Sequence, residues 1–554
     1  MPTGTGSMGS PFRLLWADDE IDLLRSHILY LEERGFEVTG VHSGEDALQL
    51  IAGESFDLLL LDERMPGLDG IGVLERLRGL RPDLPVVMVT KQEDEGLMEE
   101  AIGRSIADFL TKPVNPSQVL SVCKRVLESS RLRGEAITRD YTREFARLSG
   151  RLSSGPLSPV EWGDLAEALA WWSLQLDETG QEGLAESLLT LQREADSVFA
   201  RQVIETYPEW VATERERPGR PGERERDPCG LPPLPVQEAT RPFFTADVAE
   251  GALLPLLAET GRVLFIVLDC LRLDQWLAIE PLIPGSIHLE RVPIFSLLPS
   301  ASPYSRNALL SGCFPDEIAG RYPELWTATE NYGEEGLNRF EPEMITGVLE
   351  RAAGRTGNAR LALFERVRSP AEGEAVARRL AGGVPDGLSV AIFNFLDLLV
   401  HDRTESRVLK ELAPDSAAFR SVAREWFRHS PLPELIERAA GDGVPILIAT
   451  DHGSTQVGRS IEVKADHTAT HGVRYKVGRN LNADQRWTHR IDDLASWRLP
   501  PGGLTTTYLL ARENAFLLFT SDAALQRKRF DGSFQHGGIS LSEVIIPLVR
   551  LTSR

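Results

Sequence analysis

The chain has 554 residues, of which 42% are hydrophobic and 26% are charged, and its formal net charge is -22. This length exceeds what one hydrophobic core normally organises, so we expect several domains. The acidic balance excludes general DNA or RNA binding through a basic surface. The four cysteines form no CxxC pair, which excludes a zinc finger or disulfide framework and is typical of the reducing cytoplasm. No apolar run has the length of a membrane span, so no membrane partner is expected.

Residues 1–10 contain no apolar segment and predict a disordered tail. Residues 11–130 then alternate short apolar strands with stretches of helical periodicity. This alternation predicts a parallel sheet covered by helices. The first structured part of the chain is therefore expected to be an α/β domain.

Several of these strands end on polar residues with related chemistry, namely Asp18, Asp19, Asp62, Thr90 and Lys112. Because the carboxyl ends of parallel strands meet at one edge of a sheet, we expect these side chains to converge. Three neighbouring carboxylates repel one another unless a divalent cation lies among them, and hard oxygen ligands suit Mg²⁺. A lysine opposite them can stabilise a phosphoryl group, and a threonine hydroxyl can bond to it.

This set resembles the receiver domain of two-component response regulators, which is flavodoxin-like, and the resemblance covers residues 12 to about 128. It implies that a sensor histidine kinase phosphorylates Asp62. It also implies Mg²⁺ coordination by Asp18, Asp19 and the backbone carbonyl of Arg64, switching by Thr90 and Phe109, and phosphoryl binding by Lys112. A flavodoxin-like domain with unrelated acidic turns is the alternative.

Residues 131–212 carry no strand signal and predict a helical bundle of about three helices. Ser158 is the expected N-cap of one helix, with Pro159 at its first position and Glu161 at its third. Residues 213–238 combine proline, glycine and mixed charges, a composition that predicts a flexible linker.

From residue 239 to 554 the βα pattern returns, and metal-ligand residue types again follow its apolar strands. The strand "RVLFIVLD" ends on an aspartate, and "VPILIATDH" ends on an aspartate and a histidine. Three carboxylates and three imidazoles lie at or near such strand ends: Asp269, Asp397, His401, Asp451, His452 and His536. Each alone is consistent with a helix cap, a core histidine or a Gly-rich turn. Together they supply ligands for two adjacent divalent ions.

A two-metal site that hydrolyses phosphoesters often also needs a nucleophile. The segment "LLPSASPYSRNALLSG" offers Ser300, Ser302 and Ser305. A serine hydroxyl is a weak nucleophile at its free pKa but becomes an alkoxide when it binds a metal. The residue types alone leave the three serines open.

This constellation resembles the alkaline phosphatase superfamily, which includes nucleotide phosphodiesterases and binuclear phosphomutases. In the phosphodiesterase branch the nucleophile lies ten residues before a glycine that here corresponds to Gly312, which selects Ser302. That branch uses threonine, so serine is a departure. The resemblance implies two Zn²⁺ ions, with Mn²⁺ admissible, whose ligand sets are Asp397, His401 and His536 for one and Asp269, Asp451, His452 and Ser302 for the other. His467 and His471 are alternatives to His536 as the late ligand.

The motifs "DCLRLDQW", "RNALLSG", "RYKVGRNL" and "HGGISLSEVIIPL" are similar to the PglZ branch of the superfamily. A receiver, a helical bundle and a PglZ-like α/β domain in this order resemble the PorX-like response regulators associated with type IX secretion. The resemblance implies a cytoplasmic regulator and a phosphodiester substrate of the nucleotide or oligonucleotide class.

Residues 457–480 form a polar stretch with a local excess of basic residues. We interpret it as a lid that clamps phosphate oxygens and stacks on a base, with candidate residues Lys464, Arg474, Tyr475, Lys476 and Arg479. A solvated loop is the alternative.

The sequence thus predicts a metal-dependent phosphodiesterase that is controlled by phosphorylation and forms a homodimer when phosphorylated. The competing hypothesis is a regulatory scaffold that binds secretion-system or sigma-factor partners with little catalytic activity, because a scaffold can keep a metal for stability.

Overall fold

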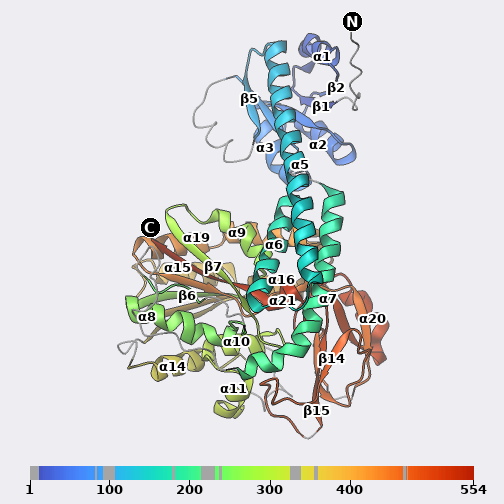
Figure 1. Cartoon of the computed structure of the whole chain (residues 1–554). Coiled ribbons are helices and arrows are strands. Elements are labelled where there is room, and N and C mark those ends of the chain that lie inside the picture. The colour runs from blue at the N-terminus through green and yellow to red at the C-terminus, as the bar shows by residue number, and fades with distance from the viewer. Residues whose placement is uncertain are drawn as a thin grey trace. The chain divides into compact units, whose positions relative to one another are not determined.

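The computed structural model of the chain (Figure 1) describes residues 12–81, 84–91, 106–177, 181–213, 231–235, 240–324, 338–354, 360–465, 469–470, 472–503 and 505–553. Structural statements below refer to these residues. The chain divides into two compact units, one formed by residues 1–144 and 176–184 and the other by residues 145–175 and 185–554. In the part of the chain that the structure describes, no helix combines the length and apolarity needed to cross a bilayer.

The first unit contains a five-stranded parallel sheet in the order β2-β1-β3-β4-β5, which confirms the predicted flavodoxin-like fold. Its strands are β1 (Phe12–Ala17), β2 (Phe36–Val41), β3 (Leu58–Asp62), β4 (Val86–Thr90) and β5 (Asp108–Thr111). Its helices are η1 (Ile21–Leu24), α1 (Arg25–Glu32), α2 (Gly44–Gly53), α3 (Gly70–Leu80) and the first part of α5 (Pro116–Ser153).

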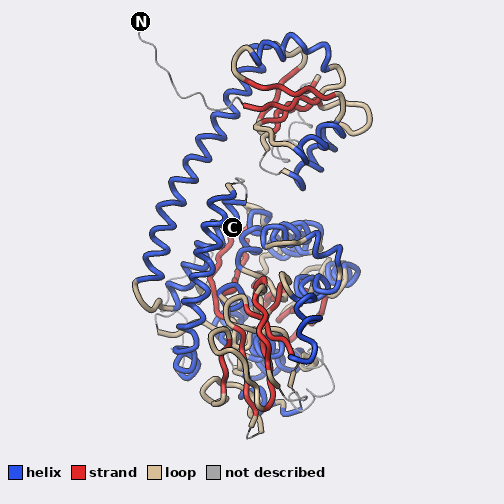
Figure 2. The backbone as a smooth tube through the Cα atoms, turned by 90° about the vertical axis from the view of Figure 1, so that its right-hand side faces the viewer, coloured by secondary structure: helices blue, strands red, loops and turns tan. Residues whose placement is uncertain are grey.

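Helices lie on both faces of this sheet (Figure 2), which explains why its central strands are apolar throughout. In β3, Leu59 and Leu61 belong to a core shared with α2 and α3. Leu58 and Leu60 point the other way, into a core shared with α1 and α5. The period-2 alternation of strand side chains therefore fills two cores from one continuous apolar run.

Three helices follow the sheet, as predicted: the remainder of α5, then α6 (Pro159–Asp177) and α7 (Glu182–Ala212). The predicted capping box opens α6, because Ser158 N–H donates to the Glu161 carboxylate at 2.8 Å and Glu161 N–H donates to Ser158 Oγ at 3.3 Å. Helix α5 is continuous through residue 130, the predicted boundary between the first domain and the helical bundle.

The second unit is built on a six-stranded sheet in the order β7-β18-β10-β6-β9-β8. Its strands are β6 (Arg262–Leu268), β7 (Ile287–Phe295), β8 (Leu361–Val367), β9 (Gly387–Phe393), β10 (Ile446–Ala449) and β18 (Ile545–Ser553). Strands β8, β9, β6 and β10 are parallel, and β18 runs antiparallel to β10 and β7.

The helices of this unit are η2 (Thr245–Asp247), η3 (Ala249–Leu253), α8 (Leu254–Thr260), α9 (Leu273–Ile279), η4 (Glu280–Leu282), α10 (Ser302–Ser311), α11 (Pro315–Arg321), α14 (Glu341–Arg351), α15 (Pro370–Arg379), α16 (Phe395–Glu405), α17 (Arg407–Leu412), α18 (Ser416–His429), α19 (Leu432–Gly441), η6 (Thr520–Asp522), α20 (Ala523–Phe530) and α21 (Leu541–Val544). Leu264, Ile266 and Leu268 of β6 face a core that α9, α15, α18 and α19 complete.

The described residues between 459 and 519 form a small β unit with its own core, which includes much of the stretch 457–480 that we interpreted from the sequence as a lid. It contains β12 (Arg459–Val463), β13 (Tyr475–Arg479), β14 (Thr488–Ile491), β15 (Thr506–Ala511) and β16 (Ala515–Phe519), while β11 (Thr455–Gln456) pairs with β17 (Phe534–Gln535). Apolar residues such as Ile461, Val463, Leu509 and Leu517 are buried together inside it.

Helix α7 packs against the end of β7 in the six-stranded sheet. Phe199 and Trp210 of α7 contact Phe295 at the end of β7, with ring centroids 6.4 and 5.9 Å apart. Within the predicted linker, the structure describes residue 213 and residues 231–235, where Leu234 is buried and its N–H donates to Glu290 at 3.1 Å. This part of the predicted linker is packed against the α/β domain.

Candidate active site

The three acidic residues predicted at the edge of the receiver sheet lie together in the structure. Asp62 ends β3, and Asp18 and Asp19 follow the neighbouring strand β1. One carboxylate oxygen from each lies within 4.8 Å of the others, and Asp18 and Asp62 are buried. Such a group of oxygen ligands could hold a hard divalent cation.

Lys112 completes this cluster, because its Nζ lies 2.8 Å from Asp18 Oδ2 and 2.9 Å from Asp62 Oδ2. Burial raises the pKa of Asp62, and Lys112 only partly offsets that rise. Burial would lower the pKa of Lys112, but its bonds to Asp18 and Asp62 raise it overall, so the ammonium stays charged.

The predicted switch residues flank the cluster. The Thr90 hydroxyl, at the end of β4, donates to the carboxylate of Glu63, a partner that the sequence reasoning missed. Phe109 lies half-buried in the next strand, β5. The side chain of Arg64 is exposed, in keeping with a role predicted for its backbone carbonyl alone.

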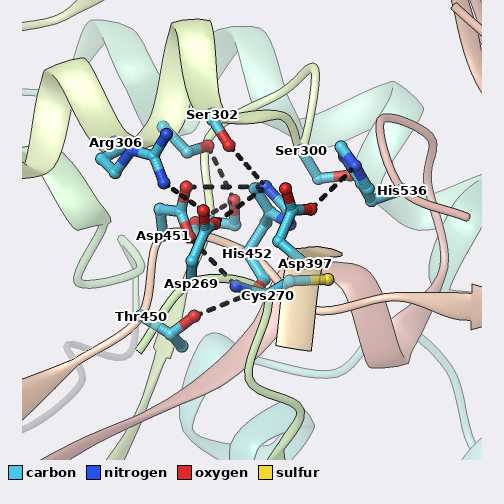
Figure 3. A network of polar contacts seen from close by, with 12 residues as sticks. Asp269, Cys270, Ser300, Ser302, Arg306, Asp397, Thr450, Asp451, His452 and His536 are labelled. Atoms are coloured by element: carbon cyan, nitrogen blue, oxygen red, sulfur yellow. Dashed lines mark hydrogen bonds and ion pairs between the residues drawn. The ribbon is translucent and has the colours of Figure 1, made fainter. Parts of the chain in front are cut away.

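In the second unit the predicted metal ligands also meet at the carboxyl ends of parallel strands (Figure 3). Asp269 follows β6, and Asp451 and His452 follow β10. Asp397 and His401 lie one helical turn apart at the start of α16, which follows β9. Because β10, β6 and β9 are neighbours in the sheet, three separate segments deliver their ligands to one place.

The first ligand group consists of Asp269, Asp451 and His452, all fully buried, with ligand atoms within 4.8 Å of one another. His452 Nδ1 bonds the Gly453 carbonyl at 3.0 Å, which turns Nε2 toward the two carboxylates. His452 Nε2 lies 3.5 Å from Asp451 Oδ2 and 4.0 Å from Asp269 Oδ1. These two oxygens are buried and have no hydrogen-bond partner among the described residues.

The second ligand group consists of Asp397, His452 and His536, whose ligand atoms lie within 4.8 Å of one another, so His452 belongs to both groups. The predicted ligand His401 lies beside this group. Asp397 Oδ1 lies 3.5 Å from His401 Nε2 and 3.4 Å from His536 Nε2, and the two imidazole nitrogens are 3.4 Å apart. The rings of His452 and His536 stack with centroids 4.2 Å apart, so the two groups adjoin. His401 is exposed, whereas the other ligands are buried or half-buried. His467 and His471, the alternatives to His536, lie outside the described residues.

Of the three candidate serines, Ser302 points its hydroxyl at His452 (Figure 3). Its Oγ lies 3.1 Å from His452 Nε2, and it occupies the first position of α10. Ser305 Oγ donates to the Leu297 carbonyl at 3.2 Å, and Ser300 Oγ donates to the Gly538 carbonyl at 2.9 Å. These bonds tie Ser305 and Ser300 to neighbouring loops, whereas the Ser302 hydroxyl contacts His452.

The electrostatics fit cation binding. Burial raises the pKa of Asp269 to about 7. Burial opposes ionisation of Asp451 as well, but His452 and Arg306 lower its pKa below the ordinary range. Burial and neighbouring positive charge lower the pKa of His536, so its imidazole is neutral, the form that binds a metal. Carboxylate oxygens and neutral imidazoles are donors that Zn²⁺ and Mn²⁺ accept, so both groups could hold a metal ion.

Comparison with known families identifies three segments of the chain. The receiver domain of response regulators matches residues 14–124, and the PorX response regulator linker domain matches residues 131–211. The BREX system PglZ alkaline phosphatase-like domain matches residues 250–551, more than half of the chain. The chain belongs to the PglZ alkaline phosphatase-like family. With its receiver and linker domain it is a PorX-like response regulator, as the sequence resemblance predicted.

Curated relatives match parts of this PorX-like chain. The regulator PhoP of Bacillus subtilis is 32% identical over 194 residues, which cover 35% of this chain and 76% of PhoP. FixJ of Bradyrhizobium diazoefficiens is 30% identical over 24% of this chain and 66% of its own length. DctD of Rhizobium meliloti is 32% identical, but the chain spans only 25% of its length.

Among solved structures, a CheY-like receiver protein from Methanospirillum hungatei is 31% identical, covers 22% of this chain and 96% of its own, and has a TM-score of 0.21.

The PglZ domain also contains site residues that the sequence reasoning missed. Arg306 forms an ion pair with Asp269 and a second one with Glu341, at 2.9 Å. Asn394 Nδ2 donates to Asp269 Oδ2 at 2.6 Å. Both had a signal in the sequence: Arg306 lies one helical turn after Ser302, and Asn394 directly follows strand β9.

The structure does not support a phosphate clamp by the predicted basic residues Arg474 and Lys476 of the PglZ domain, because both side chains are buried. Arg474 pairs with the carboxylate of Glu543. Lys476 Nζ donates to the Gly472 carbonyl at 3.0 Å and lies 3.7 Å from the Phe519 ring centroid, and burial lowers its pKa to about 7.

The other members of that predicted set divide between core and surface. Tyr475 is buried, 5.8 Å from the ring of Tyr304. Lys464 and Arg479 are exposed and remain able to meet a ligand.

Proposed function

We propose that this chain is a phosphorylation-controlled, metal-dependent phosphodiesterase whose PglZ domain cleaves nucleotide or oligonucleotide phosphodiesters. The observation that carries the proposal is the 3.1 Å approach of Ser302 Oγ to His452 Nε2, beside two adjoining groups of metal-ligand side chains. The PorX-like architecture further supports a link to type IX secretion.

The residues divide the chemistry among them. Asp269, Asp451, His452 and Ser302 would hold one Zn²⁺ and Asp397, His401 and His536 the other, and such ions supply Lewis-acid stabilisation of the charge that develops on phosphate oxygens. Ser302 Oγ attacks phosphorus and displaces one alcohol, and water then releases the phosphate monoester from the serine. Ser302 is only 5% exposed, so its hydroxyl meets the substrate already largely desolvated.

Two further elements support this role for Ser302. The serine begins the ten-residue helix α10, and the partial positive charge at a helix N-terminus favours an anionic ester there. Arg306, one turn later, and Asn394 fix the orientation of the Asp269 carboxylate. His401 is the one proposed zinc ligand whose side chain is exposed.

In the receiver, we propose that a sensor histidine kinase phosphorylates Asp62 with Mg²⁺ bound by Asp18, Asp19 and Asp62. Lys112 would then bond the phosphoryl oxygens in place of the carboxylate that it contacts now.

The test is hydrolysis of bis-p-nitrophenyl phosphate and of p-nitrophenyl phosphate, with metal analysis of the same samples. Ser302→Ala should lower diester turnover by at least about a hundredfold while both ions stay bound, because the carboxylate and imidazole ligands remain. Ser302→Thr, which keeps a hydroxyl, is the matched control and should retain turnover. A fully metallated wild type that cleaves no diester would instead favour the scaffold hypothesis.

A further inference from the structure

The carboxylate of Glu543 lies beneath the loop that carries the proposed metal ligand His536. Glu543 belongs to α21 and is fully buried. Its Oε1 accepts the N–H of Gly538 at 2.9 Å, and its Oε2 accepts the hydroxyl of Ser540 at 2.6 Å. Both bonds restrain the segment that begins two residues after His536.

Arg474 holds that carboxylate from the other side. Its Nε lies 3.1 Å from Glu543 Oε1 and its Nη2 lies 2.5 Å from Oε2, a bidentate pair between two side chains that are both 0% exposed. The remaining Nη1 donates to the Ala515 carbonyl in β16. The pair therefore ties the small β unit to the loop that carries His536.

The two glycines that follow His536 allow this close approach. A Cβ on Gly538 would lie 2.6 Å from the Arg474 guanidinium carbon, and a Cβ on Gly537 would lie 2.5 Å from the Tyr475 ring. Gly537 also has a φ of 109°, in the region that favours glycine. The "RYK" and "HGG" sequences are thus two halves of one packed contact.

Glu543 also touches the other imidazole segment. Its backbone carbonyl accepts the N–H of Gly453 at 2.9 Å, and Gly453 directly follows His452. Since His452 and His536 stack at 4.2 Å, one residue contacts the chain beside both stacked ligands.

We propose that Glu543, neutralised by Arg474, is a positioning residue that holds His536 in the geometry needed to bind its metal ion. This inference rests on the proposed function, because it assumes that His536 is a metal ligand. It gives Arg474 a role in organising the site, in place of the substrate clamp that the sequence predicted.

The experiment measures the zinc content of the full-length protein after dialysis and its zinc affinity by competition with a chelator. Glu543→Gln keeps the side-chain volume but removes the negative charge that pairs with Arg474. We expect the affinity for the second zinc ion to fall at least tenfold, while the first ion stays bound. His536→Ala should show the same selective loss. The double variant should lose no more than His536→Ala alone, because Glu543 acts through His536.

Controls separate positioning from general damage. Lys476→Met replaces a buried amine of the same β unit that contacts the Gly472 carbonyl and the Phe519 ring, so it should keep two ions even if the melting temperature changes. If Glu543→Gln fails to fold, Ser540→Ala can replace it, because it removes only one hydrogen bond to the carboxylate. We expect this variant to bind the same zinc ion several-fold more weakly.

This proposal alone would be overturned if Glu543→Gln binds two ions with unchanged affinity while His536→Ala loses one. Ser540→Ala takes the place of Glu543→Gln in this comparison if Glu543→Gln fails to fold. A wild type that binds no zinc would overturn the metal assignment and the proposal together.

Discussion

Asp269 is a buried carboxyl group that lies between positive and negative neighbours in the PglZ domain. One of its oxygens meets Arg306 and Asn394, while the other is buried and faces Asp451 and His452. Despite the nearby guanidinium, burial keeps the pKa of this carboxyl at about 7. The residue is therefore poised between a neutral acid and the charged ligand that a metal requires.

This pKa predicts a pH dependence of stability in chelator-treated protein. Between the ordinary value of 3.8 and about 7, Asp269 is protonated when folded and ionised when unfolded. The unfolded state then binds fewer protons, so the contribution of Asp269 to stability falls as pH rises through this window and is constant above it. Urea unfolding from pH 4 to 7 should show wild type losing stability relative to Asp269→Asn. A pH-independent difference between the two proteins would contradict the assignment.

At the receiver, Asp62 should be the site that accepts a phosphoryl group. Asp62→Ala is expected to abolish labelling by acetyl phosphate in the presence of Mg²⁺. The other two carboxylates of the cluster, Asp18 and Asp19, are expected to bind Mg²⁺ and so cannot accept the phosphoryl group in place of Asp62. Intact-mass spectrometry gives the measurement. The control is Asp57→Ala, which removes an acidic residue outside the cluster and should still gain one phosphoryl group. The Asp57 carboxylate accepts the Arg13 N–H at 2.7 Å.

Among the elements, the ends of strands were the most predictable part of this molecule. Asp62, Asp269 and Asp451 each follow a run of apolar residues, and the topology of a parallel sheet then dictates that such ends meet. Pairings between distant segments were not predictable. Arg474 and Glu543 are 69 positions apart, and neither flanking sequence shows that the other will neutralise it.

Two other features escaped for related reasons. The small β unit has short strands interrupted by glycine and charged residues, so residues 457–480 lack the apolar runs that predict strands. The packing of α7 on the PglZ domain was also not predicted. Many apolar residues in a helix indicate that it is buried, but they do not indicate which surface covers it.

That helix presents one stripe to the PglZ domain. Asp196, Phe199, Val203, Tyr207 and Trp210 are spaced by three or four residues, so they lie on one face. Asp196 accepts the N–H of Leu541 at 2.7 Å, and Tyr207 Oη accepts the N–H of Leu298 at 3.0 Å. Leu298 lies four residues before Ser302, so α7 supports the loop that leads to the proposed nucleophile.

Tyr207→Phe should therefore affect both stability and turnover. It leaves the Leu298 N–H buried without its acceptor, at a cost of about 1–3 kcal/mol in the free energy of unfolding. We expect diester turnover to fall several-fold with metal content unchanged, measured by steady-state kinetics and denaturant unfolding. Thr190→Ala, on the exposed side of α7, should match wild type in both. Unaltered kinetics in a destabilised Tyr207→Phe protein would mean that α7 supports only the fold.

For the whole molecule, the division into two units favours control by association. Phosphorylation adds about two negative charges at one edge of the receiver sheet, and Thr90 and Phe109 lie where they can respond. The resulting bias can stabilise a second state of the receiver surface that pairs with another copy. Residues 231–235 of the predicted linker pack on the PglZ domain, so this part of the linker is not a free hinge.

We accordingly expect Mg²⁺ with beryllofluoride to convert the protein from monomer to dimer at micromolar concentration, as measured by light scattering. The reagent mimics a phosphoryl group on Asp62, so the Asp62→Ala protein should stay monomeric under the same conditions. An unchanged mass in wild type with Asp62 shown to be occupied would leave intramolecular release as the mode of control.

The contact between α7 and β7 has a consequence for how such proteins are inherited. A gene fusion that joined the PglZ domain to a new sensor at residue 250, where the family match begins, would remove the α7 side chains that contact Phe295 and Leu298. Recombination should therefore succeed only when its breakpoint lies upstream of α6, so that α6 and α7 stay with the PglZ domain. The heritable module is then longer than the PglZ domain, and lineages that exchange sensors should carry the two helices with it.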